Sequence, residues 1–206
     1  MSAATIARLK ITLDKVKPVV LRRVEVPFDI RLDRLHLTIQ AAMGWTNSHL
    51  YEIRAGGVGW STPYPDADWA GDFIDARKAR LGDILEDIGT KTLKYLYDFG
   101  DGWEHTIKIE RLVDPKPGML YPSLIEAKGH CPPEDVGGPW GYGELLEAIA
   151  DPSHERHGEF KEWLADDFDP HVVDIDRLSD EVAYLAKPWS RRRPVKRRRA
   201  DGCGLS

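Results

Sequence analysis

Apolar residues along this chain recur with two periods, one of two residues and one of three to four, and each period predicts a different element. Residues 4–13 alternate between apolar side chains and charged or hydroxyl side chains, which is typical of a half-buried strand. From Leu32 to Met43 apolar residues recur every three or four positions and Gly44 follows, which predicts a helix that ends at this glycine. The other elements predicted in this part of the chain are strands over 19–26 and 49–55, a long loop with a short helical piece over 58–80, and one or two helical turns over 81–88.

A β-hairpin is predicted around the sequence Phe99-Gly100-Asp101-Gly102. Alternating runs precede and follow this turn. An Asp-Gly pair between two such runs is typical of a tight hairpin turn, because glycine tolerates the positive φ that the turn requires. The alternating positions are Leu93, Tyr95 and Tyr97 in the first strand, and Trp103, His105, Ile107 and Ile109 in the second.

The last part of the chain is rich first in turns and then in short helices. Residues 113–143 contain six prolines and six glycines, so we expect a loop there. Apolar residues at helical spacing then predict short helices over 142–150, 155–165 and 174–186. Together these elements predict an α+β fold: a small mixed or antiparallel sheet with a central hairpin, one N-terminal helix and several short C-terminal helices.

Charge divides the chain into an acidic body and a basic end. The net charge is −5, yet residues 187–206 contain eight Lys or Arg against one acid, while residues 1–186 contain 21 basic and 33 acidic residues. We therefore predict a single α+β domain over 1–186 and a flexible basic tail over 187–206, because the tail has few apolar residues to bury. Such a tail can hold DNA or RNA by contacts to phosphates; the alternatives are that it associates with the acidic body or has no role. The residues predicted to contact nucleic acid are Arg191, Arg192, Arg193, Lys196, Arg197, Arg198 and Arg199.

Several classes of protein are disfavoured by what the sequence lacks. It has no run of about 18 apolar residues, so we expect no membrane-spanning helix and no membrane partner. It also has no apolar signal core near its N-terminus and only two cysteines, Cys131 and Cys203, so we expect a cytoplasmic protein. The glycine-rich motifs of nucleotide-binding loops and the Gly-x-Ser-x-Gly motif of acyl hydrolases are missing, so those activities have no support.

Two segments, 98–105 and 130–142, concentrate reactive side chains on tightly turning backbone. If they face each other, carboxylates, imidazoles and one thiol gather in a small volume. Oxygen ligands favour Mg²⁺, Mn²⁺ or Ca²⁺, whereas His and Cys favour Zn²⁺. A divalent metal held there could activate water, so a metal-dependent hydrolase or nuclease is one hypothesis. The candidate ligands are Asp98, Asp101, Glu104, His105, His130, Cys131, Glu134 and Asp135.

A structural interpretation competes with this hypothesis. No Cys-x-x-Cys, His-Glu-x-x-His or calcium-loop spacing is present, so no cofactor is certain. Asp98 and Asp101 are well suited to accept hydrogen bonds from the backbone of a turn. A buried Cys131 is a small hydrophobe more often than a nucleophile. The candidates for a binding surface are Trp103, Trp140 and Tyr142, of which the two tryptophans could instead pack in the core.

Five motifs in order along the chain resemble those of the plasmid pRiA4b ORF-3-like family, whose members are often labelled passenger or TnpR proteins of insertion elements. The resemblance extends from about residue 4 to residue 186, and the last two motifs are the most specific. Leu21 departs from the pattern, since the family typically has Trp before the arginine pair. The motifs are Arg22 to Pro27, Ala42 to Trp45, His49 to Glu52, Tyr95 to His105, and Cys131 to Tyr142.

The resemblance implies a compact α+β domain associated with plasmids and mobile elements, and it brings no established activity. A resolvase activity has no support in the residues, because the serine and arginine patterns of serine recombinases and the His-x-x-Arg motif of tyrosine recombinases are missing. We therefore expect a non-enzymatic binding module that contacts another protein, or DNA or RNA, and the metal-dependent hydrolase or nuclease is the alternative.

Overall fold

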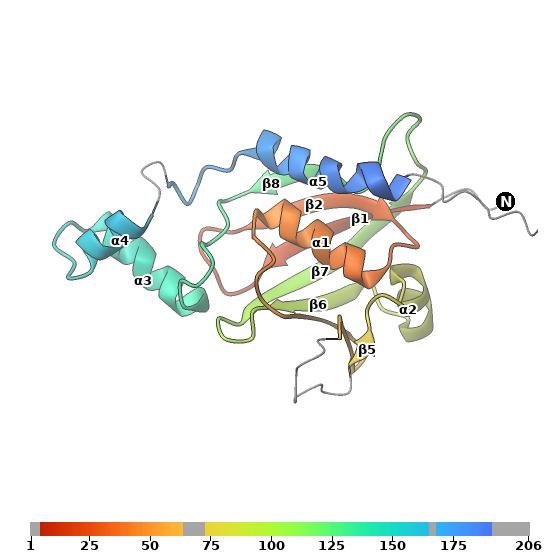
Figure 1. Ribbon diagram of the computed structural model, residues 1–206, viewed down its shortest axis with the longest axis horizontal. Helices are drawn as coiled ribbons and strands as arrows, with labels where there is room; N and C mark the ends of the chain where they lie inside the picture. Colours follow the sequence, from red (N-terminus) through yellow and green to blue (C-terminus); the bar gives the residue numbers. More distant parts are fainter. Residues whose placement is uncertain (1–4, 64–72, 165–167, 191–206) are drawn as a thin grey trace, which may run out of the picture.

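The computed structural model describes residues 5–63, 73–164 and 168–190, and these contain one eight-stranded sheet (Figure 1). The strands lie in the order β5-β4-β3-β6-β7-β1-β2-β8. Neighbouring strands are antiparallel except β4 and β5, which are parallel. The α+β class is therefore confirmed. The strands are β1 Ile6–Leu13, β2 Leu21–Pro27, β3 Tyr51–Ala55, β4 Val58–Ser61, β5 Ile74–Asp75, β6 Thr92–Tyr97, β7 Trp103–Val113 and β8 Ser123–Lys128.

Helix α1 (Leu32–Met43) has the predicted bounds and lies across one face of the sheet (Figure 1). Its apolar stripe is buried against the strands. Gly44 ends the helix in the left-handed conformation, with φ of +82°, and its N–H donates to the carbonyl of Gln40. The short helix α2 (Leu81–Ile88) also has the predicted bounds.

The predicted hairpin is formed by β6 and β7. Gly102 has a φ of +69°, as the tight turn requires. Asp98 Oδ1 accepts hydrogen bonds from the backbone N–H groups of Gly100, at 2.9 Å, and Asp101, at 3.4 Å. Asp98 therefore stabilises the turn in the way that the structural interpretation predicts.

Three strands, β4, β5 and β8, were missing from the prediction, and one predicted helical piece is missing among the described residues. The region 58–80 begins with β4, which pairs with β3 across a glycine turn, and its described part contains no helix. The region 113–143 contains β8, which pairs with β2 at the edge of the sheet. All three strands are short and their burial does not alternate clearly, so the period of two residues that reveals a strand is weak.

The C-terminal helices differ from the prediction mainly at their ends. Helices α3 (Gly138–Ala150) and α4 (His157–Trp163) pack together at one end of the molecule (Figure 1). Helix α5 (Ile175–Ser190) lies beside α1 and over β8, and it continues four residues past the expected end at 186. No helix among the described residues is long and apolar enough to cross a membrane.

The two faces of the sheet have opposite character. The face toward α1 holds the hydrophobic core. On the other face ion pairs join neighbouring strands, such as those of Arg8 with Glu25 and of Arg23 with Glu126. The functional candidates consequently lie at the ends of the strands, where loops leave the sheet, rather than on either face.

Candidate functional site

The hairpin turn and the 130–137 loop meet in the structure, as the hypothesis of a shared site requires. Asp101 Oδ2 accepts a hydrogen bond from the N–H of Gly137, at 3.2 Å, directly before α3. Gly138 lies so close that a Cβ built on it would be 2.1 Å from the carbonyl oxygen of Asp101. Since Gly138 also has a φ of +70°, only glycine fits this contact without strain. We call this contact region the loop junction.

The linker between α1 and β3 forms the third side of the loop junction. The indole N–H of Trp45 donates to the carbonyl of Pro132, at 3.0 Å, and the Trp45 ring stacks on Tyr97 with ring centroids 5.0 Å apart. Further along the linker, Thr46 Oγ1 donates to Glu134 Oε2 at 2.6 Å. These contacts fix the 130–137 loop against both the linker and the end of β6.

Glu134 is an acceptor of several hydrogen bonds rather than a free carboxylate. The hydroxyl groups of Tyr97, Thr46 and Ser48 and the N–H of Thr46 all donate to it. Burial acts to raise the pKa of Glu134, but these hydrogen bonds outweigh burial and leave the pKa below its usual value. For Tyr97, burial raises the pKa to about 12, so its hydroxyl stays protonated and donates to Glu134.

One group of potential metal ligands lies beside the loop junction. Among the described residues, ligand atoms of His49, Asp98 and Asp135 lie within 4.8 Å of one another. Asp98 Oδ2 is 3.6 Å from His49 Nδ1, and Asp135 Oδ1 is 3.2 Å from His49 Nε2. The second contact lacks hydrogen-bond geometry, because Nε2 has no hydrogen-bond partner. The group can therefore act as a pair of ionic contacts or, after a small adjustment, as three ligands for a cation.

His49 was not among the predicted ligands, although its position follows from strand pairing. Strand β3 pairs antiparallel with β6, with Tyr51 opposite Tyr97. The chain before β3 therefore runs beside the chain after β6, and Asp98 N donates to the carbonyl of Leu50 at 2.8 Å. His49 lies two residues before β3, and Asp98 lies one residue after β6. Had the pairing of these two strands been predicted, these positions would have placed His49 beside Asp98.

The other predicted ligands are engaged elsewhere. Glu104 forms a salt bridge with Lys15 on an exposed part of the hairpin. His105 is fully buried in the core, and its Nδ1 lies 3.0 Å from the carbonyl of Trp103. His130 Nδ1 lies 2.8 Å from the carbonyl of Cys131. Of the eight predicted ligands, only Asp98 and Asp135 belong to the His49 group, while Asp101 and Glu134 hold the loops together.

Cys131 is buried with 6% of its surface exposed. Burial raises the pKa of its thiol to about 12, although the charge of Arg22 acts in the opposite direction. A thiol with such a pKa is protonated at neutral pH and is a poor nucleophile. This environment favours the interpretation of Cys131 as a small core residue.

A polar cluster lies in the core behind the loop junction. The hydroxyl of Tyr95 accepts from the Gln40 amide at 2.8 Å and lies 2.9 Å from His36 Nδ1, while His36 Nε2 lies 2.6 Å from Asn47 Oδ1. The tautomer follows from these partners: Nε2–H donates to the amide oxygen of Asn47, and Nδ1 accepts from Tyr95. His36 is therefore a neutral, satisfied histidine of the core, as its place beside the apolar stripe suggests.

The predicted binding-surface aromatics separate into two groups. Trp103 and Tyr142 are 0% and 1% exposed and pack in the core, whereas Trp140 is 90% exposed in the first turn of α3. Of these three aromatic residues, only Trp140 offers its ring to a partner. The seven Lys and Arg residues predicted for nucleic-acid contact, together with Cys203, lie outside the described residues.

The chain is similar to known proteins in both sequence and structure. The sequence model of the plasmid pRiA4b ORF-3-like protein matches residues 5–177. The "Uncharacterized protein y4hQ" of Sinorhizobium fredii (strain NBRC 101917 / NGR234) is 56% identical over 190 residues, which are 92% of this chain and 96% of that protein. The crystal structure of the "Protein of Unknown Function MM3350" from Methanosarcina mazei Go1 has a TM-score of 0.75 and 34% identity, and the match covers 85% of this chain and 98% of that chain. Neither title carries the TnpR label.

Proposed function

The chain belongs to the plasmid pRiA4b ORF-3-like family, and neither relative's title states an activity. From the geometry of the loop junction, we propose that the protein is a non-enzymatic binding module that contacts another protein through Trp140. The observation that carries this proposal is the 90% exposure of the Trp140 ring at the start of α3. Tryptophan is strongly enriched among the residues that dominate binding energy at protein interfaces.

The support beneath Trp140 is rigid, which favours binding. The first turn of α3 is held by the hydrogen bond from Gly137 to Asp101 and by the close contact at Gly138. A side chain on a fixed support loses little conformational freedom when a partner covers it. Preorganisation of this kind distinguishes Trp140 from an aromatic residue on a mobile loop.

The charges near Trp140 favour a protein partner over a nucleic acid at this surface. Asp101 and Asp135 lie in the two loops of the junction, whereas Glu144, one turn beyond Trp140 on α3, already pairs with Arg156. Carboxylates repel phosphates, whereas they attract a segment that carries Lys or Arg. We therefore propose a partner that presents an apolar side chain to Trp140, flanked by basic residues.

The test compares Trp140→Ala with Tyr184→Ala, a matched control because Tyr184 is 73% exposed on α5. Proteins captured by the wild type and by Tyr184→Ala, but lost from Trp140→Ala, are the expected partners. A purified partner should then shift Trp fluorescence in the wild type and bind Trp140→Ala at least tenfold more weakly. Equal affinity for both variants would rule out the Trp140 surface.

Nucleic-acid contact through the basic tail is a separate part of this proposal. Truncation after Ser190 preserves α5, which includes Lys187 and Trp189. We expect the full chain to bind labelled DNA or RNA with an affinity that falls steeply with salt, and the truncated chain to lose most of it. Binding that is independent of salt, or equal for the two chains, would refute a role for the tail.

A second candidate, a metal-dependent hydrolase or nuclease, is favoured by the proximity of His49, Asp98 and Asp135. These residues offer one imidazole and two carboxylates, a ligand set suited to Zn²⁺ or Mn²⁺. His49, Asp98 and Asp135 would hold the metal, which would supply an activated water. The group is smaller than the predicted set of eight and includes a ligand that was not predicted.

Calorimetric titration with Mn²⁺ and Zn²⁺, followed by hydrolysis of bis(p-nitrophenyl) phosphate, tests this candidate. Asp98→Asn is the informative variant, because its amide oxygen can still accept the hydrogen bonds of the turn while the negative charge is lost. We expect one equivalent of metal for the wild type and at least tenfold weaker binding for Asp98→Asn and His49→Ala. Metal binding that both variants retain would place the metal elsewhere.

A further inference from the structure

Arg22 occupies a position in β2 where an apolar side chain would be expected. It lies on the core face of the strand, between Val20 and Val24, and it is 0% exposed. Arginine is almost never fully buried unless a partner of opposite charge accompanies it. The surroundings of Arg22 therefore require an explanation.

Two of the three guanidinium nitrogens of Arg22 bind backbone carbonyl groups. Nε donates to the carbonyl of Ala42, at 2.6 Å, in the last turn of α1. Nη1 donates to the carbonyls of Leu21, Lys128 and Gly129 at 2.8 to 3.1 Å. These bonds join the end of α1 to the end of β8, so this part of the side chain has a structural role.

The third nitrogen, Nη2, is buried and has no hydrogen-bond partner. No carboxylate bonds to the guanidinium among the described residues, whose acidic groups form their salt bridges with other cations. Burial lowers the pKa of Arg22, but an arginine remains protonated in proteins. A positive charge is thus held in the interior with only carbonyl dipoles around it, which is costly without an anion.

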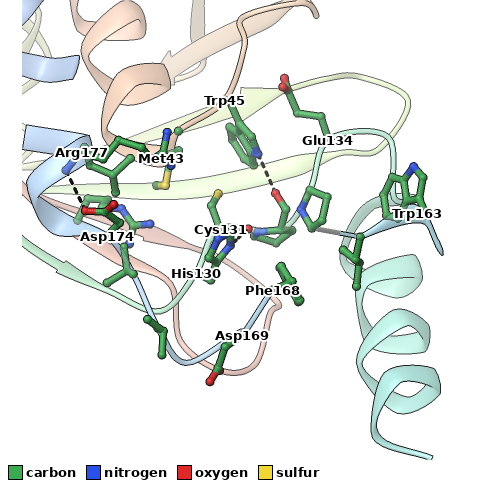
Figure 2. Close-up of a pocket in the computed structure, with 18 residues that line it drawn as sticks. Met43, Trp45, His130, Cys131, Glu134, Trp163, Phe168, Asp169, Asp174 and Arg177 are labelled. Atoms are coloured by element: carbon green, nitrogen blue, oxygen red, sulfur yellow. Dashed lines mark hydrogen bonds between the residues drawn. The ribbon is translucent and has the colours of Figure 1, made fainter. Parts of the chain in front are cut away.

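A cavity of about 680 Å³ adjoins this charge, and Arg22 is among its lining residues. The cavity lies between the end of α1, the start of the 130–137 loop and the segment that leads into α5 (Figure 2). Met43, Trp45 and Phe168 contribute apolar walls. Its volume lies within the usual range for sites that bind small molecules.

The acidic residues that line the cavity are engaged with other groups. Asp174 accepts a hydrogen bond from the N–H of Arg177, and Asp169 accepts one from the N–H of His171. The carboxylate of Glu134 points away from the cavity in Figure 2, toward its donors on the linker. The acids of the lining thus accept hydrogen bonds from other groups, whereas the charge of Arg22 has only backbone carbonyls as acceptors.

We infer that this cavity binds a small organic anion whose apolar body packs against Met43, Trp45 and Phe168. Its carboxylate or phosphate group reaches Arg22 Nη2 after a shift of the side chains that cover this atom. The anion supplies both the missing acceptor and the missing opposite charge. This site is distinct from the His49 group and from Trp140, so it does not depend on the function proposed above.

The test uses benzoate and phenyl phosphate as probes on the full chain at constant ionic strength, with neutral benzamide for comparison. A dissociation constant of about 1 mM predicts that 10 mM probe raises the melting temperature by about 3 °C. We expect one or both anions to do so and benzamide to have no effect. The stronger of the two responses tells whether the site prefers a carboxylate or a phosphate.

Arg22→Gln is the decisive variant, because it removes the charge and retains an amide donor. Arg23→Gln is its matched control, since Arg23 lies on the opposite face of β2 with Glu110 and Glu126. The shift should vanish in Arg22→Gln and persist in Arg23→Gln. Equal shifts in both variants, or no response of the wild type to either anion, would overturn the inference.

Val172→Trp keeps the test decisive if Arg22→Gln does not fold. Val172 is 61% exposed at the border of the cavity, so a larger side chain there obstructs the cavity without entering the core. Loss of the anion-dependent shift in this variant supports the site. A shift that Val172→Trp retains in full would place the anion outside the cavity.

Discussion

Two buried histidines should make this protein sensitive to mild acid. His36 and His105 are 4% and 0% exposed in the core. Burial lowers the pKa of each to about 4, although their hydrogen bonds act in the opposite direction. Each ring is therefore neutral in the folded protein at pH values where the unfolded chain is already protonated.

The magnitude follows from the difference between the folded pKa and the unfolded value of about 6.5. Below pH 6.5 the unfolded chain binds a proton that the folded protein does not, so the free energy of unfolding falls with pH until about pH 4. Between pH 7 and pH 5 the loss is about 2 kcal/mol for each histidine. The two together should cost about 4 kcal/mol over this interval, before most carboxylates titrate.

Urea unfolding followed by Trp fluorescence at pH 7 and pH 5 measures this loss. In His105→Asn the amide can still donate to the carbonyl of Trp103, so the variant removes the titrating group with little change in hydrogen bonding. We expect the loss between the two pH values to decrease by about half in this variant, and to be unchanged in His171→Asn, whose histidine is exposed. A loss in His105→Asn equal to that of the wild type would refute the argument for His105.

Three further predictions concern the loop junction. In a urea titration, Gly138→Ala should lower the free energy of unfolding by more than about 1–2 kcal/mol. A left-handed backbone alone costs roughly that much, and the new Cβ would also meet the Asp101 carbonyl. Gly143→Ala, in open space on the same helix, should not destabilise the protein. Cys131 should resist iodoacetamide at pH 8 in the folded protein and react in urea, as peptide mass spectrometry would show, because its thiol is buried and has a pKa of about 12. Glu134→Ala should cost about 1 kcal/mol of stability, measured by urea unfolding, because the part-buried hydroxyl of Tyr97 loses its acceptor, whereas the exposed donors of Thr46 and Ser48 can bond to water.

The elements that the sequence predicted well depend on short-range signals. The bounds of α1 follow from its apolar stripe and from Gly44, and the hairpin follows from alternation on both sides of an Asp-Gly turn. Each signal lies within about a dozen residues and does not require knowledge of the rest of the fold. The early start of α3 was missed because Pro139 and three glycines in its first turns are typical of loops, whereas proline is also favoured at the first positions of a helix.

One missed strand, β8, depends on a partner far away in the sequence. Strand β8 exists because it pairs with β2, with Leu21 opposite Lys128, more than one hundred residues apart. Its own residues are only partly buried, so no alternation marks it. The loop junction has the same origin: residue types identified the two loops as candidates, but the pairing of β3 with β6 brings His49 beside Asp98.

Single side chains here divide their atoms between a structural role and a proposed binding role, which explains why residue types alone left both interpretations open. Asp98 uses Oδ1 to stabilise the hairpin turn and directs Oδ2 toward His49. Arg22 uses Nε and Nη1 to join α1 to β8 and leaves Nη2 without an acceptor beside a cavity. A turn-stabilising aspartate and a metal ligand are therefore not exclusive descriptions of Asp98, and a structural arginine can also bind an anion. Substitutions that retain one atom's hydrogen bonds and remove the charge, such as Asp98→Asn and Arg22→Gln, are the experiments that separate the two roles.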